Sequence, residues 1–139
     1  MRETSTFVQD LLTNLDQKRT HLAVFRMWCQ ERHPPECETV FNQIIENTRE
    51  MIDILIDALK KEGVPIPDHL PNPRFIAEAR KQPNSNARLH FAERFLRRSL
   101  AWYEERLARA QDPEEREVWE RLFELEATNW ALVEDYLNP

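Results

Sequence analysis

The sequence predicts an all-α protein, an antiparallel four-helix bundle made of two helical hairpins joined by one long, proline-rich crossover. Glycine occurs once in 139 residues, although all-β folds and phosphate-cradling loops need several glycines. Four segments carry apolar residues at helical spacing. Only a few residues separate the first two segments and the last two, whereas a long stretch separates the middle two. This pattern of connections favours two hairpins and one crossover.

The first two predicted helices cover residues 6–32 and 35–62. The first ends before Pro34 and Pro35, because proline cannot continue a helix and restricts the residue before it. The second tolerates proline in its first turn and stops at Gly63, the residue type that most readily takes the left-handed conformation at a helix end. The short connection predicts an antiparallel pair.

The last two predicted helices cover residues 86–110 and 113–137, and Asp112 is the expected N-cap of the final helix. The crossover, residues 64–85, contains five prolines and several apolar side chains that suit packing. A segment of this length can run along the bundle and return the third helix parallel to the second. We therefore expect residues 1–139 to form a single domain.

Composition excludes several classes of function. A net charge of −6 argues against a general nucleic-acid binder, which needs a basic face. No apolar run approaches the ~20 residues that span a bilayer, so we expect no membrane partner. Residues 1–9 are polar and lack the apolar core of a signal peptide, which predicts a cytoplasmic protein. Cys29 and Cys37 are expected to be free thiols in that reducing compartment.

Five polar side chains fall within the apolar arcs when each helix is drawn on a wheel at about 100° per residue. Lys18 and Thr48 lie at similar distances from the first interhelical turn and should therefore face each other, and Ser99 and Glu126 stand in the same relation across the second turn. Asn129 follows Glu126 by one helical turn. These residues predict a polar layer inside the bundle. Lys18 either pairs with Glu126 or extends its ammonium group to solvent, and the sequence leaves both open.

The last predicted helix resembles that of the rubrerythrin-type members of the ferritin-like superfamily, whose di-iron sites combine glutamates with Glu-x-x-His motifs. Glu126 matches the motif glutamate, Asn129 stands where the histidine is expected, and Glu93 matches the glutamate of the third helix. The first hairpin departs from the pattern, because Lys18 or Arg19 occupies the level of a carboxylate. The resemblance therefore implies a ferritin-like scaffold with a degenerate di-iron motif.

Three functions follow as expectations. The leading one is a non-enzymatic ferritin-like protein without catalytic residues or cofactor, acting through contacts with an unknown protein partner and forming a homodimer. The first alternative is a di-iron carboxylate protein, an oxidoreductase or iron-handling protein, that binds iron or manganese through Glu93, Glu126 and Asn129. The second alternative is a small-molecule binder that uses the bundle core.

Aromatic residues form a second stripe on the third predicted helix. Phe91, Phe95 and Trp102 lie outside the main apolar stripe of residues 86–110. Such a stripe packs under the crossover, forms a dimer interface or lines a ligand pocket, since interfaces and pockets are both rich in aromatic side chains. The sequence leaves these three interpretations open.

Overall fold

The computed structural model describes residues 5–139, so residues 1–4 of the polar N-terminal segment lie outside it. The described residues form five helices and no strand, which confirms the all-α class. None of these helices is long and apolar enough to cross a membrane. The helices are α1 (Thr6–Cys29), α2 (Pro35–Lys61), α3 (Pro73–Arg80), α4 (Ser85–Arg109) and α5 (Pro113–Leu137).

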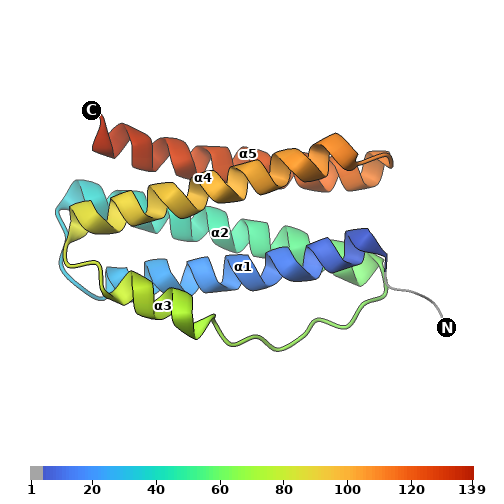
Figure 1. Cartoon of the computed structure of the whole chain (residues 1–139), viewed down its shortest axis with the longest axis horizontal. Coiled ribbons are helices and arrows are strands. Elements are labelled where there is room, and N and C mark those ends of the chain that lie inside the picture. The colour runs from blue at the N-terminus through green and yellow to red at the C-terminus, as the bar shows by residue number, and fades with distance from the viewer. Residues whose placement is uncertain (1–4) are drawn as a thin grey trace.

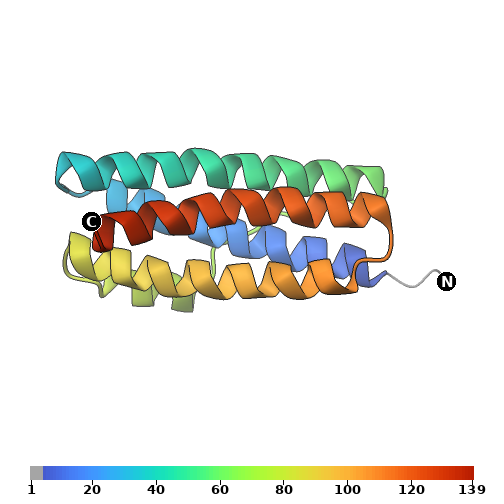
Figure 2. The same cartoon turned by 90° about the horizontal axis from the view of Figure 1, so that it is seen from above.

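The four long helices lie lengthwise beside one another, as Figures 1 and 2 show. α1 packs against α2, α2 against α5 and α5 against α4, whereas α1 and α4 approach each other at few points. Residues 64–72 run along the outside of α1 to α3, which packs on α1 (Figure 1). This path returns the chain to the end where α2 began, so α4 runs in the same direction as α2.

The predicted boundaries hold within one residue for α2, α4 and α5. α1 was expected to reach residue 32, but it ends at Cys29. Its last turn is tightened by hydrogen bonds from the amides of Gln30 and Glu31 to the carbonyls of Met27 and Trp28. The His33 ring nitrogen Nε2 lies 2.8 Å from the Trp28 carbonyl oxygen, so a side chain takes the place of another helical turn.

Two apolar clusters fill the interior, and the buried polar residues separate them along the helix axes. One cluster lies toward the turn between α1 and α2, and the other lies toward the turn between α4 and α5. The largest fully buried apolar side chains of the first are Trp28, Phe25, Phe41, Ile44 and Leu89, and those of the second are Tyr103, Leu11, Leu15, Met51, Leu55 and Leu59.

The aromatic stripe of α4 packs partly against α3. The ring of Phe75 lies 5.5 Å from that of Phe91 and 5.3 Å from that of Phe95, centroid to centroid, both in edge-to-face geometry. Such pairs stabilise beyond the area that they bury. Trp102, further along α4, packs edge-on against Trp119 of α5 instead. The Phe75 ring therefore holds the short α3 against α4, while α3 also packs on α1.

Gly63 ends α2 with a φ of +71°. Its amide donates to the Lys60 carbonyl, and the amide of Val64 donates to the Leu59 carbonyl, both at 3.0 Å. This pair of bonds is the Schellman arrangement, which satisfies carbonyls that the helix leaves without partners. The turn directs the chain into the 64–72 segment.

Replacing Gly63 by alanine is expected to lower the free energy of unfolding by about 1 kcal/mol, because a side chain makes the left-handed conformation costly. A Cβ at this position meets nothing within 4 Å, so the loss reflects backbone strain alone. Gly63→Asn is the matched control and should lose less, since asparagine tolerates this conformation. Urea denaturation measures both, and equal stability of Gly63→Ala and the parent would contradict the assignment.

Candidate functional site

The five residues of the predicted polar layer are all buried in the structure: Lys18, Thr48, Ser99, Glu126 and Asn129. Lys18 and Glu126 are each only 1% exposed and form an ion pair. Of the two arrangements that the sequence left open for Lys18, the structure has the buried pair and not an ammonium group in solvent. Burial of two charges is tolerable only when they are paired and hydrogen-bonded.

Hydrogen bonds around the pair use all three donors of the ammonium group. Besides Glu126, Lys18 Nζ donates to Ser99 Oγ at 2.9 Å and contacts His21 Nδ1 at 3.4 Å. Ser99 Oγ in turn donates to Glu126 Oε2 at 2.5 Å. The side-chain amide of Asn129 donates to the other carboxylate oxygen of Glu126, Oε1, at 3.1 Å. Both charges are therefore surrounded by hydrogen-bonding partners.

The network reaches every long helix. Asn47 of α2 donates its side-chain amide to Asn129 Oδ1 at 2.9 Å. On the other side, the Tyr103 hydroxyl of α4 donates to Asn14 Oδ1 of α1 at 2.7 Å. Thr48 was expected to face Lys18, but its hydroxyl donates to the Ile44 carbonyl of its own helix at 2.7 Å. Thr48 is thus buried beside the layer without being hydrogen-bonded to Lys18.

Sequence reasoning missed four members of this layer: Asn14, His21, Asn47 and Tyr103. Asn14, Lys18 and His21 follow one another at spacings of four and three residues, which puts them on one helix face. That spacing was a usable signal for α1. Tyr103 reads as an ordinary apolar-stripe residue in the sequence, and only its partner Asn14 reveals its polar role.

The metal ligands of the first alternative have other side chains as partners in the structure. Glu93, 17% exposed, accepts a hydrogen bond from Trp130 Nε1 at 3.0 Å and lies 3.3 Å from Arg97 Nε. Glu126 and Asn129 instead bond to each other and to the Lys18 network. Across residues 5–139, no three His, Cys, Asp or Glu side chains gather as a metal ion would require. The two cysteines are free thiols.

Burial changes the acidity of the layer. It lowers the pKa of Lys18 from its usual value, although the Glu126 carboxylate opposes this effect. It lowers the pKa of His21 well below its usual value, and the positive charges of Lys18 and Arg98 lower that pKa further. His21 is therefore a neutral imidazole at pH 7, in keeping with Nδ1 accepting from the donor-only ammonium group.

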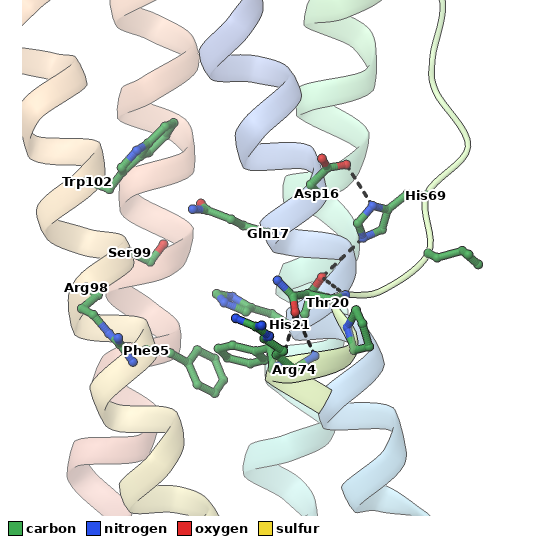
Figure 3. Close-up of a pocket in the computed structure, with 14 residues that line it drawn as sticks. Asp16, Gln17, Thr20, His21, His69, Arg74, Phe95, Arg98, Ser99 and Trp102 are labelled. Atoms are coloured by element: carbon green, nitrogen blue, oxygen red, sulfur yellow. Dashed lines mark hydrogen bonds and ion pairs between the residues drawn. The ribbon is translucent and has the colours of Figure 1, made fainter. Parts of the chain in front are cut away.

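A groove of about 800 Å³ opens between α1 and α4, and α3 with its preceding segment closes one end. Figure 3 shows Gln17, Thr20 and His21 on the α1 wall and Phe95, Arg98, Ser99 and Trp102 on the α4 wall. The buried residues His21 and Ser99 both line the groove and contact Lys18. The groove therefore extends from the surface to the polar layer.

The 64–72 segment is held on α1 by polar contacts at the edge of this groove. His69 Nδ1 lies 2.9 Å from an oxygen of Asp16, and its Nε2 lies 3.3 Å from the Thr20 hydroxyl (Figure 3). The Thr20 hydroxyl also accepts from the amide of Asn72 at 3.2 Å. Arg19 donates to the Pro67 carbonyl at 2.8 Å. These bonds position one rim of the groove.

Comparison of the chain with protein-family models, with curated proteins and with solved structures finds no match. The geometry of the polar layer and of the groove is therefore the basis for a functional proposal.

Lys18→Met is expected to lower the free energy of unfolding by about 3–5 kcal/mol at pH 7, because it leaves the Glu126 carboxylate buried without its cation. The double variant Lys18→Met/Glu126→Leu should recover most of this loss, since it removes both charges. Lys60→Met, at an exposed position of α2, is the matched control. Urea denaturation at pH 7 measures all three. A loss below about 1 kcal/mol in the single variant would show that the pair is dispensable.

Proposed function

We propose that this chain is a ferritin-like four-helix bundle that has exchanged a metal site for a buried ion pair and binds a small molecule in the groove between α1 and α4. Two antiparallel helix pairs and one long crossover support the scaffold half of the proposal. The groove of about 800 Å³ is the observation that supports small-molecule binding. Its volume lies within the roughly 300–1,000 Å³ of ordinary ligand sites.

The exchange of metal for an ammonium group follows from charge. Di-iron sites of this scaffold use several carboxylates to neutralise two cations. Here the interior holds the carboxylate of Glu126, and the ammonium group of Lys18 is bonded to it. Ser99 and Asn129 occupy further positions around that carboxylate with neutral side chains. We infer that Lys18 supplies the positive charge that the metals supply elsewhere.

Protein purified without a histidine tag and incubated anaerobically with Fe(II) is therefore expected to retain no stoichiometric iron, because Lys18 competes for the one buried carboxylate of the layer. Elemental analysis after gel filtration measures the metal content, and a di-iron protein treated in the same way is the positive control. About two retained irons per chain would contradict the proposal that the ion pair replaces a metal site, and would favour the di-iron alternative.

The packing of the aromatic stripe favours small-molecule binding over protein contacts, because its side chains pack within the protein and form no exposed apolar face. Phe91 and Phe95 pack against Phe75, and Trp102 packs against Trp119. Among the described residues, Leu70 is the only large apolar side chain left exposed. A homodimer and a protein partner stay predictions, whereas the groove offers a concave surface with aromatic and hydrogen-bonding walls.

A neutral planar probe, 2-naphthamide, is expected to bind saturably in the groove, because Phe95 and Trp102 supply rings for packing. Amide chemical shifts measured by NMR should change for groove residues of α1, α3 and α4. Gln17→Trp, which adds bulk at an exposed groove position, should weaken binding about tenfold or more.

The matched control is Gln9→Trp, at an exposed position of α1 outside the groove. It should leave the affinity unchanged. Saturable binding of neither 2-naphthamide nor its carboxylate analogue, 2-naphthoate, would contradict a planar-ligand site in this groove.

A further inference from the structure

Two guanidinium groups line the groove without carboxylate partners. Arg74 projects from α3 and Arg98 from α4 (Figure 3). In residues 5–139, five arginines pair with carboxylates within 4 Å, namely Arg49, Arg88, Arg97, Arg106 and Arg109, and Arg74 and Arg98 are not among them. The acidic residue of the groove is Asp16, and His69 already contacts it. The walls therefore carry two guanidinium groups against one carboxylate.

The floor of the groove adds no net charge, because His21 is neutral and Lys18 is paired with Glu126. The charges of Lys18 and Arg98 both act on His21, which lines the groove from α1. Glu126 neutralises Lys18 within the polar layer, whereas the guanidinium group of Arg98 has no carboxylate within 4 Å in the described part of the chain. This local sign is opposite to the net charge of −6 on the whole chain. An excess of cations in one concave site of an acidic protein favours an anionic ligand.

We propose that the groove selects a planar aromatic carboxylate, with the carboxylate bound by Arg98 and Arg74 and the ring packed against Phe95 and Trp102. This inference rests on the proposed function and names the ligand class of that same groove. Guanidinium groups match carboxylates in geometry and form charge-assisted hydrogen bonds with them. Aromatic rings beside these groups provide the apolar contact surface that a planar ligand needs.

Leu70 fits this arrangement. It is 89% exposed, and it lines the groove from the segment that His69 and Asn72 hold on α1. An apolar side chain at the mouth loses its contact with water when a ring lies beneath it, which is favourable. Leu70 is thus an apolar residue of the groove that a ligand can cover.

Three probes share one naphthalene ring and differ in charge: 2-naphthoate is negative, 2-naphthamide is neutral and 2-naphthylmethylamine is positive. Differences in their affinity therefore report the effect of charge at nearly constant shape. Isothermal titration calorimetry at pH 7 is expected to give 2-naphthoate an affinity about tenfold or more above that of the amide, and the amine the weakest affinity. Arg98→Met and Arg74→Met should each remove most of the preference for the carboxylate over the amide. Arg97→Met, which changes an exposed neighbour that is not part of the groove, should leave the preference intact.

His21 supplies a second readout inside the folded protein. The charges of Lys18 on its own helix and of Arg98 on α4 act on its ring. Arg74 of α3 and the Asp16–His69 pair line the same groove, and Glu126 lies beyond Lys18. A bound carboxylate offsets the charge of Arg98 and so raises the pKa of His21, which a neutral amide does not do. NMR titration of the imidazole, with and without each probe, measures this difference.

The outcomes distinguish the preference for an anion from the existence of a small-molecule site. Equal affinity of carboxylate and amide, unaffected by Arg98→Met and Arg74→Met, overturns the anion preference and leaves the small-molecule site standing. Tighter binding of the amine than of the carboxylate also overturns it, since it reverses the sign. Binding of none of the three probes removes the small-molecule site itself.

Discussion

The buried ion pair between Lys18 and Glu126 is the interaction on which the rest of the interior depends. A charge in an apolar interior is costly unless a partner and hydrogen bonds compensate for it, and here Ser99, His21 and Asn129 provide those bonds. The continuation through Asn47 brings α2 into the same network. One set of polar contacts therefore connects all four long helices. We regard this layer as the feature that specifies how they align, because a shift along the axis of any helix would leave a buried charge or amide without its partner.

The same contacts explain why a groove exists. α1 and α4 approach each other at few points, and the buried polar bonds between them are those of Lys18 with Ser99 and of Tyr103 with Asn14. Nearer the turn between α4 and α5, Asp10 of α1 also pairs with Arg106 of α4. At one end, the Phe75 ring of α3 packs against α4 while the helix rests on α1. The two walls are thus joined at the floor and held apart at the rim. The resulting space is bordered by neutralised charge below and by the guanidinium groups of Arg74 and Arg98 above, and the ligand preference that we propose rests on this distribution of charge.

Much of the fold was predictable because its signals are local. Prolines and the single glycine mark the helix ends, and the boundaries of α2, α4 and α5 follow from them within one residue. The end of α1 was not predictable in this way, because the His33 side chain takes up a carbonyl of its last turn through a contact formed in the folded chain. In the site, helical periodicity placed Lys18 and Glu126 inside, but their pairing depends on how far apart two helices lie, which periodicity does not contain.

The helical class, the limits of α2, α4 and α5 and the presence of buried polar residues follow from the sequence alone, since each of these depends on neighbours within one or two turns of the chain. The packing of the helices settles that Lys18 pairs with Glu126, that the Thr48 hydroxyl donates to its own helix, and that Glu93 contacts Trp130 and Arg97. It also settles that α1 and α4 stand apart and leave a groove. These features depend on distances between segments as far as 108 positions apart in the chain, and such distances are set only when all the helices pack together.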